Sequence, residues 1–157
     1  MTVSLRLACA LRGDSTRAGP EGGTLINPAV RPAQLVIALK ELLQPGSVVV
    51  NIVTPAAFAL TPKLATYTAS KAALHVLSAA LDRELKSRGV RVVRVYPGAT
   101  ATEFFERAGA RTPRFAVRPE TVAKKVVACV EKGCREVFVP SLLGFLQVFS
   151  PLNLYRA

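Results

Sequence analysis

The chain has 157 residues, with 21 Lys and Arg against 10 Asp and Glu and a formal net charge of +11. This length allows one domain with a core, and the 50% hydrophobic content excludes a chain that is disordered by composition. The basic residues form no dense run and no aromatic stacking set accompanies them, which argues against nucleic-acid binding. Cys9, Cys129 and Cys134 have no Cys-x-x-Cys spacing, and the single His75 completes no ligand set. We therefore predict no metal site and a reduced, cytoplasmic setting.

The first predicted element follows a segment without clear structure. Residues 1–24 end in a run rich in Gly and Pro, which predicts a loop. A helix is predicted over residues 33–44, where leucines recur at helical spacing before Pro45-Gly46. Asn27 precedes it and is followed by Pro28, a natural first residue of a helix, so a helix-capping role for Asn27 stays open.

Residues 47–53 contain a nearly continuous run of β-branched side chains, which predicts a strand buried on both faces. Thr54 follows at the carboxyl end of this strand, where ligands bind in open α/β sheets. Its hydroxyl could hydrogen-bond a substrate oxygen. The alternative is that Thr54 only initiates the turn at Pro55.

A long helix is predicted over residues 64–88, with Gly89 just beyond its end. Tyr67 and Lys71 are four residues apart and therefore lie on one face of this helix. An ammonium group beside a phenol favours the phenolate and lowers the pKa of the phenol. Such a pair can exchange a proton with a carbonyl or alcohol oxygen. The same spacing is also common in helices without any catalytic role.

Further along, a strand over residues 90–96 ends at Pro97-Gly98, a helix is predicted over 119–132 and a short strand over 136–139. The intervening residues 103–118 are predicted to form a loop with apolar contacts from its phenylalanines. Residues 137–155 are uncharged and long enough to cross a bilayer, but two prolines interrupt them. We favour a terminal helix that packs on the domain or a partner, with membrane contact as the less favoured alternative.

The order of these residues resembles the short-chain dehydrogenase/reductase family. That family's pattern is an Asn, a Ser, a Tyr-x-x-x-Lys pair and a Pro-Gly loop with a Thr four residues after the Gly. The matching positions here are Asn27, Thr54, Tyr67, Lys71, Pro97, Gly98 and Thr102. Thr54 departs from the pattern because it keeps the hydroxyl but adds a methyl group. The resemblance divides the chain into a divergent segment 1–24, the C-terminal half of a Rossmann-type domain at 25–140, and a hydrophobic tail at 141–157.

The resemblance implies an α/β fold, a partial Rossmann-like (doubly wound) parallel sheet of about three strands with flanking helices. It implies NAD or NADP as cofactor and a ketone or secondary alcohol as substrate. Tyr67 would be the general acid/base, Lys71 would lower its pKa and touch the nicotinamide ribose, and Thr54 would position the substrate oxygen. Asn27 would hold a relay water.

In relatives the loop that matches Pro97, Gly98 and Thr102 contacts the nicotinamide. The two helices that match 33–44 and 64–88 form a dimer interface in relatives, so a homo-oligomer is expected.

The family's glycine-rich turn, Gly-x-x-x-Gly-x-Gly, does not occur in this sequence. That turn lets the backbone approach the pyrophosphate of a dinucleotide at a helix N-terminus. The alternative to an oxidoreductase is therefore a truncated, non-catalytic remnant, or an oligomerising partner that lacks dinucleotide binding.

Overall fold

The computed structural model describes residues 29–59, 65–102 and 111–148, so Asn27 and the segment 1–24 lie outside the described residues. The helices are α2 (Arg31–Leu39), α3 (Ala65–Leu85), α5 (Pro119–Lys132) and α6 (Gly144–Val148). The strands are β1 (Val48–Ile52), β2 (Arg91–Pro97) and β3 (Glu136–Val139). Short 3-10 turns are η2 (Lys40–Leu42), η3 (Pro55–Phe58), η4 (Lys86–Arg88) and η5 (Ser141–Leu143).

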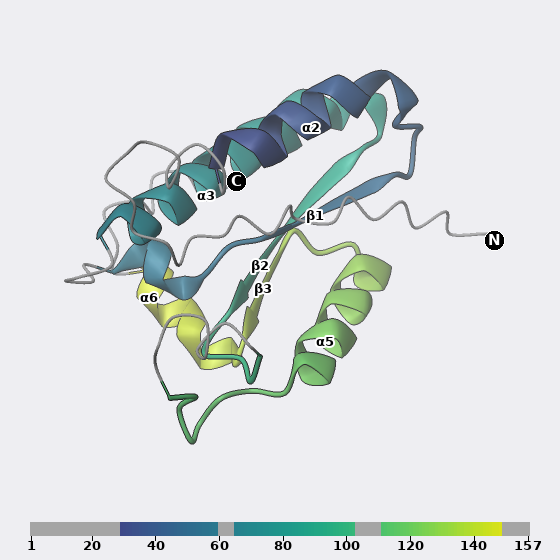
Figure 1. Cartoon of the computed structure of the whole chain (residues 1–157). Helices are drawn as coiled ribbons and strands as arrows, with labels where there is room; N and C mark the ends of the chain where they lie inside the picture. The colour runs from purple at the N-terminus through teal and green to yellow at the C-terminus, as the bar shows by residue number, and fades with distance from the viewer. Residues whose placement is uncertain (1–28, 60–64, 103–110, 149–157) are drawn as a thin grey trace.

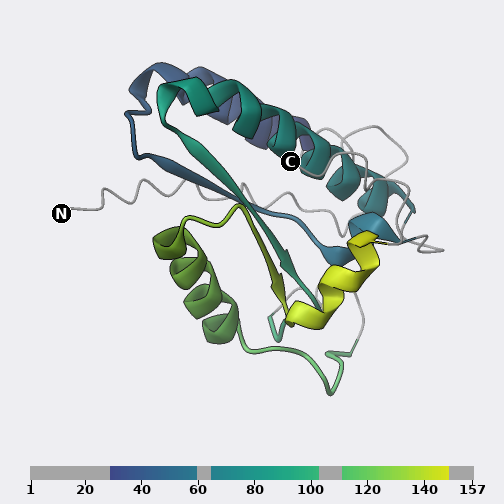
Figure 2. The ribbon, with the colours of Figure 1, turned by 180° about the vertical axis from the view of Figure 1, so that it is seen from behind.

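The three strands form one parallel sheet in the order β1-β2-β3 (Figure 1). Val50 of β1 pairs with Val93 of β2, and Tyr96 of β2 pairs with Phe138 of β3. Helices α2 and α3 cover one face of the sheet and α5 covers the other, as Figure 2 shows from behind. The predicted α/β class, with three parallel strands and flanking helices, is confirmed.

Burial on both faces explains the β-branched runs of the sequence. Val49 and Val92 pack under α2 and α3 with Leu81 and Leu85. On the opposite face a second set packs under α5: Val48, Val50, Val93, Val95, Cys129 and Val130. Neighbouring residues of a strand point to opposite faces, so a strand that is covered on both sides is apolar at most of its positions.

The helix ends follow the sequence signals. Gly89 and Gly133 adopt left-handed backbone conformations, with φ of 70° and 77°, directly after η4 and α5. Glycine accepts this conformation without the steric cost that a Cβ atom brings. The predicted helix over 64–88 is therefore confirmed, with its last turn tightened into η4.

The expectation of reduced cysteines is wrong for one pair. Cys129 and Cys134 form a disulfide across the end of α5, with their Cα atoms 5.1 Å apart. Gly133 turns the chain back so that Cys134 lies beside Cys129, which sequence spacing alone did not indicate. Cys129 also packs in the core, with 5% of its surface exposed.

The chain after β3 turns back onto the domain. In η5 and α6 it packs against β3 and against η3, at the carboxyl end of the sheet (Figure 1). Over the ranges 29–59, 65–102 and 111–148, no helix combines the length and the apolar composition needed to cross a membrane. A short terminal helix on the domain is thus confirmed for residues 144–148.

Candidate functional site

The candidate site lies at the carboxyl ends of β1 and β2. Thr54 comes two residues after β1, and Gly98 directly follows β2. Parallel strands end at the same edge of a sheet, which is where ligands bind in open α/β folds. The N-terminal part of α3 passes this edge and adds Tyr67 and Lys71.

Two interactions fix the side chains that α3 contributes. Lys71 donates a hydrogen bond from Nζ to the carbonyl oxygen of Ile52, at 3.1 Å, in the last residue of β1. The hydroxyl of Tyr67 is in hydrogen-bond contact with the hydroxyl of Thr54. The structure therefore brings together Thr54, Tyr67 and Lys71, three of the predicted site residues.

The structure confirms the turn-initiating role of Thr54, and the contact of its hydroxyl with a substrate oxygen stays a prediction. Its side chain caps η3, because Oγ1 accepts a hydrogen bond from the backbone N–H of Ala56 at 3.4 Å. The same hydroxyl faces Tyr67. In one and the same arrangement, the side chain of Thr54 caps the turn and places its hydroxyl beside Tyr67.

Burial dominates the electrostatics of the pair on α3. It raises the pKa of Tyr67 above its ordinary value, and the hydrogen bond with Thr54 opposes that shift. Burial lowers the pKa of Lys71 to about 8. The predicted lowering of the pKa of Tyr67 is therefore wrong for the chain in this state. The cause is the loss of water around the phenol, which disfavours the phenolate.

The loop after β2 is anchored by its own backbone. Gly98 donates its N–H to the carbonyl oxygen of Val139 at 2.8 Å, and Thr100 donates Oγ1–H to the carbonyl oxygen of Gly98 at 3.0 Å. A side chain at position 98 would place its Cβ 2.8 Å from Cδ1 of Leu143 in η5. Thr102 is exposed at the end of the described part of this loop.

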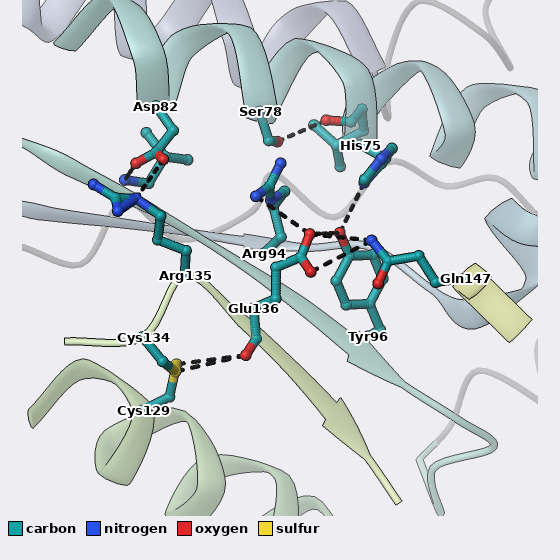
Figure 3. Close-up of polar contacts among 12 residues, drawn as sticks. His75, Ser78, Asp82, Arg94, Tyr96, Cys129, Cys134, Arg135, Glu136 and Gln147 are labelled. Atoms are coloured by element: carbon teal, nitrogen blue, oxygen red, sulfur yellow. Dashed lines mark hydrogen bonds and ion pairs between the residues drawn. A yellow bond between two sulfur atoms is a disulfide. The ribbon is translucent and has the colours of Figure 1, made fainter. Parts of the chain in front are cut away.

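Sequence reasoning missed a buried polar network that begins at His75, one helical turn after Lys71 on α3 (Figure 3). Nδ1 of His75 lies 2.7 Å from Oη of Tyr96, and Tyr96 donates to Oε1 of Glu136 at 3.4 Å. Nη2 of Arg94 lies 3.2 Å from the same Oε1. Gln147 of α6 donates to both carboxylate oxygens at 3.3 and 3.4 Å.

A signal for this network was present on α3. Lys71, His75, Ser78 and Asp82 follow each other at helical spacing and form a polar stripe along the face that meets the sheet. Asp82 accepts hydrogen bonds from the backbone of Val92 at 2.8 Å and from Nε of Arg135 at 2.7 Å. A polar stripe within an otherwise apolar helix face indicates partners on the opposing strands.

His75 and Tyr96 resist ionisation in this network. Burial lowers the pKa of His75, with the charge of Arg94 acting in the same direction and that of Glu136 against it. Burial and the Glu136 carboxylate raise the pKa of Tyr96. Among the described residues no group of His, Cys, Asp and Glu could hold a metal ion.

Comparison with known proteins places the chain in a family. A family model described as short chain dehydrogenase matches residues 26–112, a range that contains all seven predicted site residues. The chain belongs to the short-chain dehydrogenase family. An uncharacterized oxidoreductase of Staphylococcus saprophyticus is 39% identical over 61 residues, which cover 39% of this chain and 26% of that relative. One of Staphylococcus aureus is 32% identical over 91 residues, covering 57% and 39%.

Solved structures of the family share the fold. A short-chain dehydrogenase from Sphingobium yanoikuyae in complex with NADPH is 25% identical, with a TM-score of 0.57. One from Burkholderia cenocepacia in complex with NADP is 28% identical, with a TM-score of 0.56. The chain spans 43% and 42% of those two proteins, so each is more than twice as long as the part it shares.

Proposed function

We propose that this chain belongs to an NAD(P)-dependent oxidoreductase that reduces a ketone or oxidises a secondary alcohol. The observation that carries the proposal is the hydroxyl pair of Tyr67 and Thr54 at the end of β1, with Lys71 one helical turn further along α3. The family assignment supports it, as do the NADP-type cofactors of the two solved relatives above.

Each residue has a defined task in this proposal. In the reducing direction Tyr67 donates the proton of Oη to the carbonyl oxygen of the substrate, and in the oxidising direction it accepts that proton. Thr54 positions the same oxygen through its hydroxyl. Lys71, when protonated, would favour the phenolate of Tyr67 and would donate to the nicotinamide ribose of a bound cofactor. Asn27, outside the described residues, would hold a relay water.

The described residues fit one end of the dinucleotide. Lys71 and Tyr67 offer two donors suited to a ribose diol, and the anchored loop at Pro97 and Gly98, with Thr102 beyond it, would border the nicotinamide. When bound, the dinucleotide supplies the hydride. The sequence contains no glycine-rich turn that would hold the pyrophosphate end of the dinucleotide.

The missing turn supports a second candidate, a non-catalytic partner that associates with a further protein or with a second copy. In that case the dinucleotide loses the contacts that normally hold its phosphates. The residues of the site would then remain in place without binding a cofactor.

A cofactor titration separates the two candidates. The purified chain is titrated with NADPH and with NADH while the nicotinamide fluorescence is followed. Lys71→Ala is compared with Lys86→Ala, which removes an exposed lysine from η4 at the other end of the same helix.

Saturable binding that is weakened by Lys71→Ala and unchanged by Lys86→Ala supports the oxidoreductase. Substrate screening with Tyr67→Phe as the inactive reference then follows. No binding up to millimolar cofactor rejects catalysis by this chain alone and favours the non-catalytic partner.

A further inference from the structure

The terminal segment of η5 and α6 distributes its side chains in an unusual way. Gln147 is 3% exposed, whereas Leu142, Phe145 and Leu146 are 72%, 62% and 42% exposed. In a soluble protein large apolar side chains are normally inside and amides outside. This segment buries its amide and presents its apolar residues, which we call the terminal apolar patch.

The exposure of this patch does not come from a loose segment. Gln147 donates to both oxygens of Glu136, and Leu143 packs against Gly98. The segment also contacts η3, which begins directly after Thr54. The outward direction of Leu142, Phe145 and Leu146 is therefore fixed by the way the segment docks, and large apolar side chains exposed together in one short segment mark an interaction surface.

Cationic side chains border the patch. Lys125 of α5 donates from Nζ to Oγ of Ser141, the first residue of η5, at 3.2 Å, and Lys124 beside it is exposed. Both lysines remain accessible to an anion because neither is engaged with a carboxylate in the described part of the chain.

A second basic and aromatic segment lies at the same end of the sheet. Val117 bonds to the backbone of Ala99 and Ala101 in the loop after β2, next to the point where Gly98 meets η5. Figures 1 and 2 show this segment and α6 at the end to which the strand arrows point. The segment carries Phe115, 80% exposed, and three exposed arginines: Arg111, Arg114 and Arg118.

We propose that this end of the molecule binds the surface of a membrane that contains anionic lipid. The terminal apolar patch and Phe115 would enter the boundary between headgroups and acyl chains, and the surrounding Arg and Lys would contact lipid phosphates. Charge argues against a second copy of the chain as the occupant. At this face two copies would bring the same basic side chains together and repel one another, whereas an anionic bilayer attracts these side chains.

The test is co-sedimentation of the full chain with lipid vesicles. One set consists of phosphatidylcholine alone and the other contains one-quarter phosphatidylglycerol. We expect binding to the anionic set to be at least about tenfold tighter and to weaken at high salt. Equal binding to both sets, or binding to neither, overturns the proposal.

Matched variants locate the surface. Leu142→Ser/Phe145→Ser/Leu146→Ser should weaken vesicle binding about tenfold or more, because it removes the inserted apolar area. The control Ile37→Ser/Leu42→Ser changes side chains that are 51% and 63% exposed on α2 and η2, and should bind like the parent. Circular dichroism of each variant confirms that it is folded.

The charges are tested in the same way. Lys124→Glu/Lys125→Glu should weaken binding more than Arg83→Glu/Lys86→Glu, which makes the same change of net charge on α3 and η4. Equal losses in the two variants would show attraction by net charge alone and overturn the assignment of the surface. A dimer in sedimentation equilibrium that the triple serine variant dissociates would assign the patch to a second copy instead.

Discussion

Arg94 and Glu136 lie directly opposite each other on β2 and β3, and Nη2 of Arg94 is 3.2 Å from Oε1 of Glu136. The arginine side chain is 1% exposed and the glutamate side chain 21% exposed. Nε and Nη1 of Arg94 have no hydrogen-bond partner within the described part of the chain. The guanidinium therefore depends on one carboxylate for its charge compensation.

We expect Glu136→Gln to lower the free energy of unfolding by about 3 kcal/mol, because it leaves a buried cation unpaired. Urea denaturation at neutral pH measures the change. The control is Glu41→Gln, which removes one side of the exposed pair with Arg88 and should leave stability unchanged within error. Similar losses in both variants would contradict a special role for the buried pair.

Lys71 makes the stability of the domain depend on pH. Its pKa is lowered to about 8 in the folded chain, while the ordinary value for lysine is about 10.4. Between these values the unfolded chain binds the proton and the folded chain does not, so stability rises with pH across this window. Below pH 8 the folded chain must hold a buried ammonium, and the full cost is present.

Replacing Lys71 by Met removes this titration. The parent should gain about 1–3 kcal/mol of stability relative to Lys71→Met between pH 7.5 and pH 10. The measurement is urea denaturation of both proteins across that range, in which the other lysines cancel. A constant difference between the two proteins would show that Lys71 titrates normally.

Gly98 and Gly144 offer a test of close packing at the site. A Cβ at position 98 would lie 2.8 Å from Cδ1 of Leu143, whereas a Cβ at position 144 would meet Phe138 at an ordinary 3.5 Å. We expect Gly98→Ala to destabilise by about 1 kcal/mol or more through overpacking, and Gly144→Ala to be nearly neutral.

Thermal denaturation compares these two variants. Adding Leu143→Ala to Gly98→Ala should recover part of the loss if the clash is its cause. Additive losses in the double variant would place the cause elsewhere in the loop.

Substitutions of Thr54 test its hydroxyl and its methyl group separately at the proposed catalytic position. Thr54→Ser keeps the hydroxyl and should retain most of the catalytic activity, whereas Thr54→Val should lower kcat/KM by about tenfold to hundredfold. Tyr67→Phe should cost about 10² to 10⁴-fold, the usual contribution of a general acid/base.

The pH profile of kcat/KM gives an independent test of the hydrogen bond between Thr54 and Tyr67. The hydrogen bond from Thr54 opposes the rise in the pKa of Tyr67, so its loss in Thr54→Val should move the ionisation of Tyr67 to higher pH. An unchanged profile in Thr54→Val would show that the two hydroxyls do not interact during turnover.

The sequence predicted the elements well because their signals are local. The β-branched run at Val48–Ile52 and the left-handed glycines after η4 and α5 depend on neighbouring residues alone. The grouping of Thr54 with Tyr67 was also accessible, because the resemblance to the short-chain dehydrogenase/reductase family implied it.

The polar network could not be predicted in the same way. His75, Tyr96, Glu136 and Gln147 come from four different elements, and their contacts depend on the register of β2 and β3 and on where α6 returns. The disulfide likewise required the backward turn at Gly133. The pKa of Tyr67 depended on burial, which the Tyr-x-x-x-Lys spacing does not report.

Helix α3 carries two kinds of residue along one face. Near the start of the helix, Tyr67 and Lys71 lie at the strand ends. Further along, Asp82 accepts hydrogen bonds from the backbone of Val92 in β2 and from Arg135, which directly precedes β3. The position of α3 on the sheet therefore also depends on contacts that lie several turns beyond the site residues. For protein engineering, transferring this site to another protein would therefore require the whole of α3 and the three strands of the sheet, and not the Tyr-x-x-x-Lys motif alone.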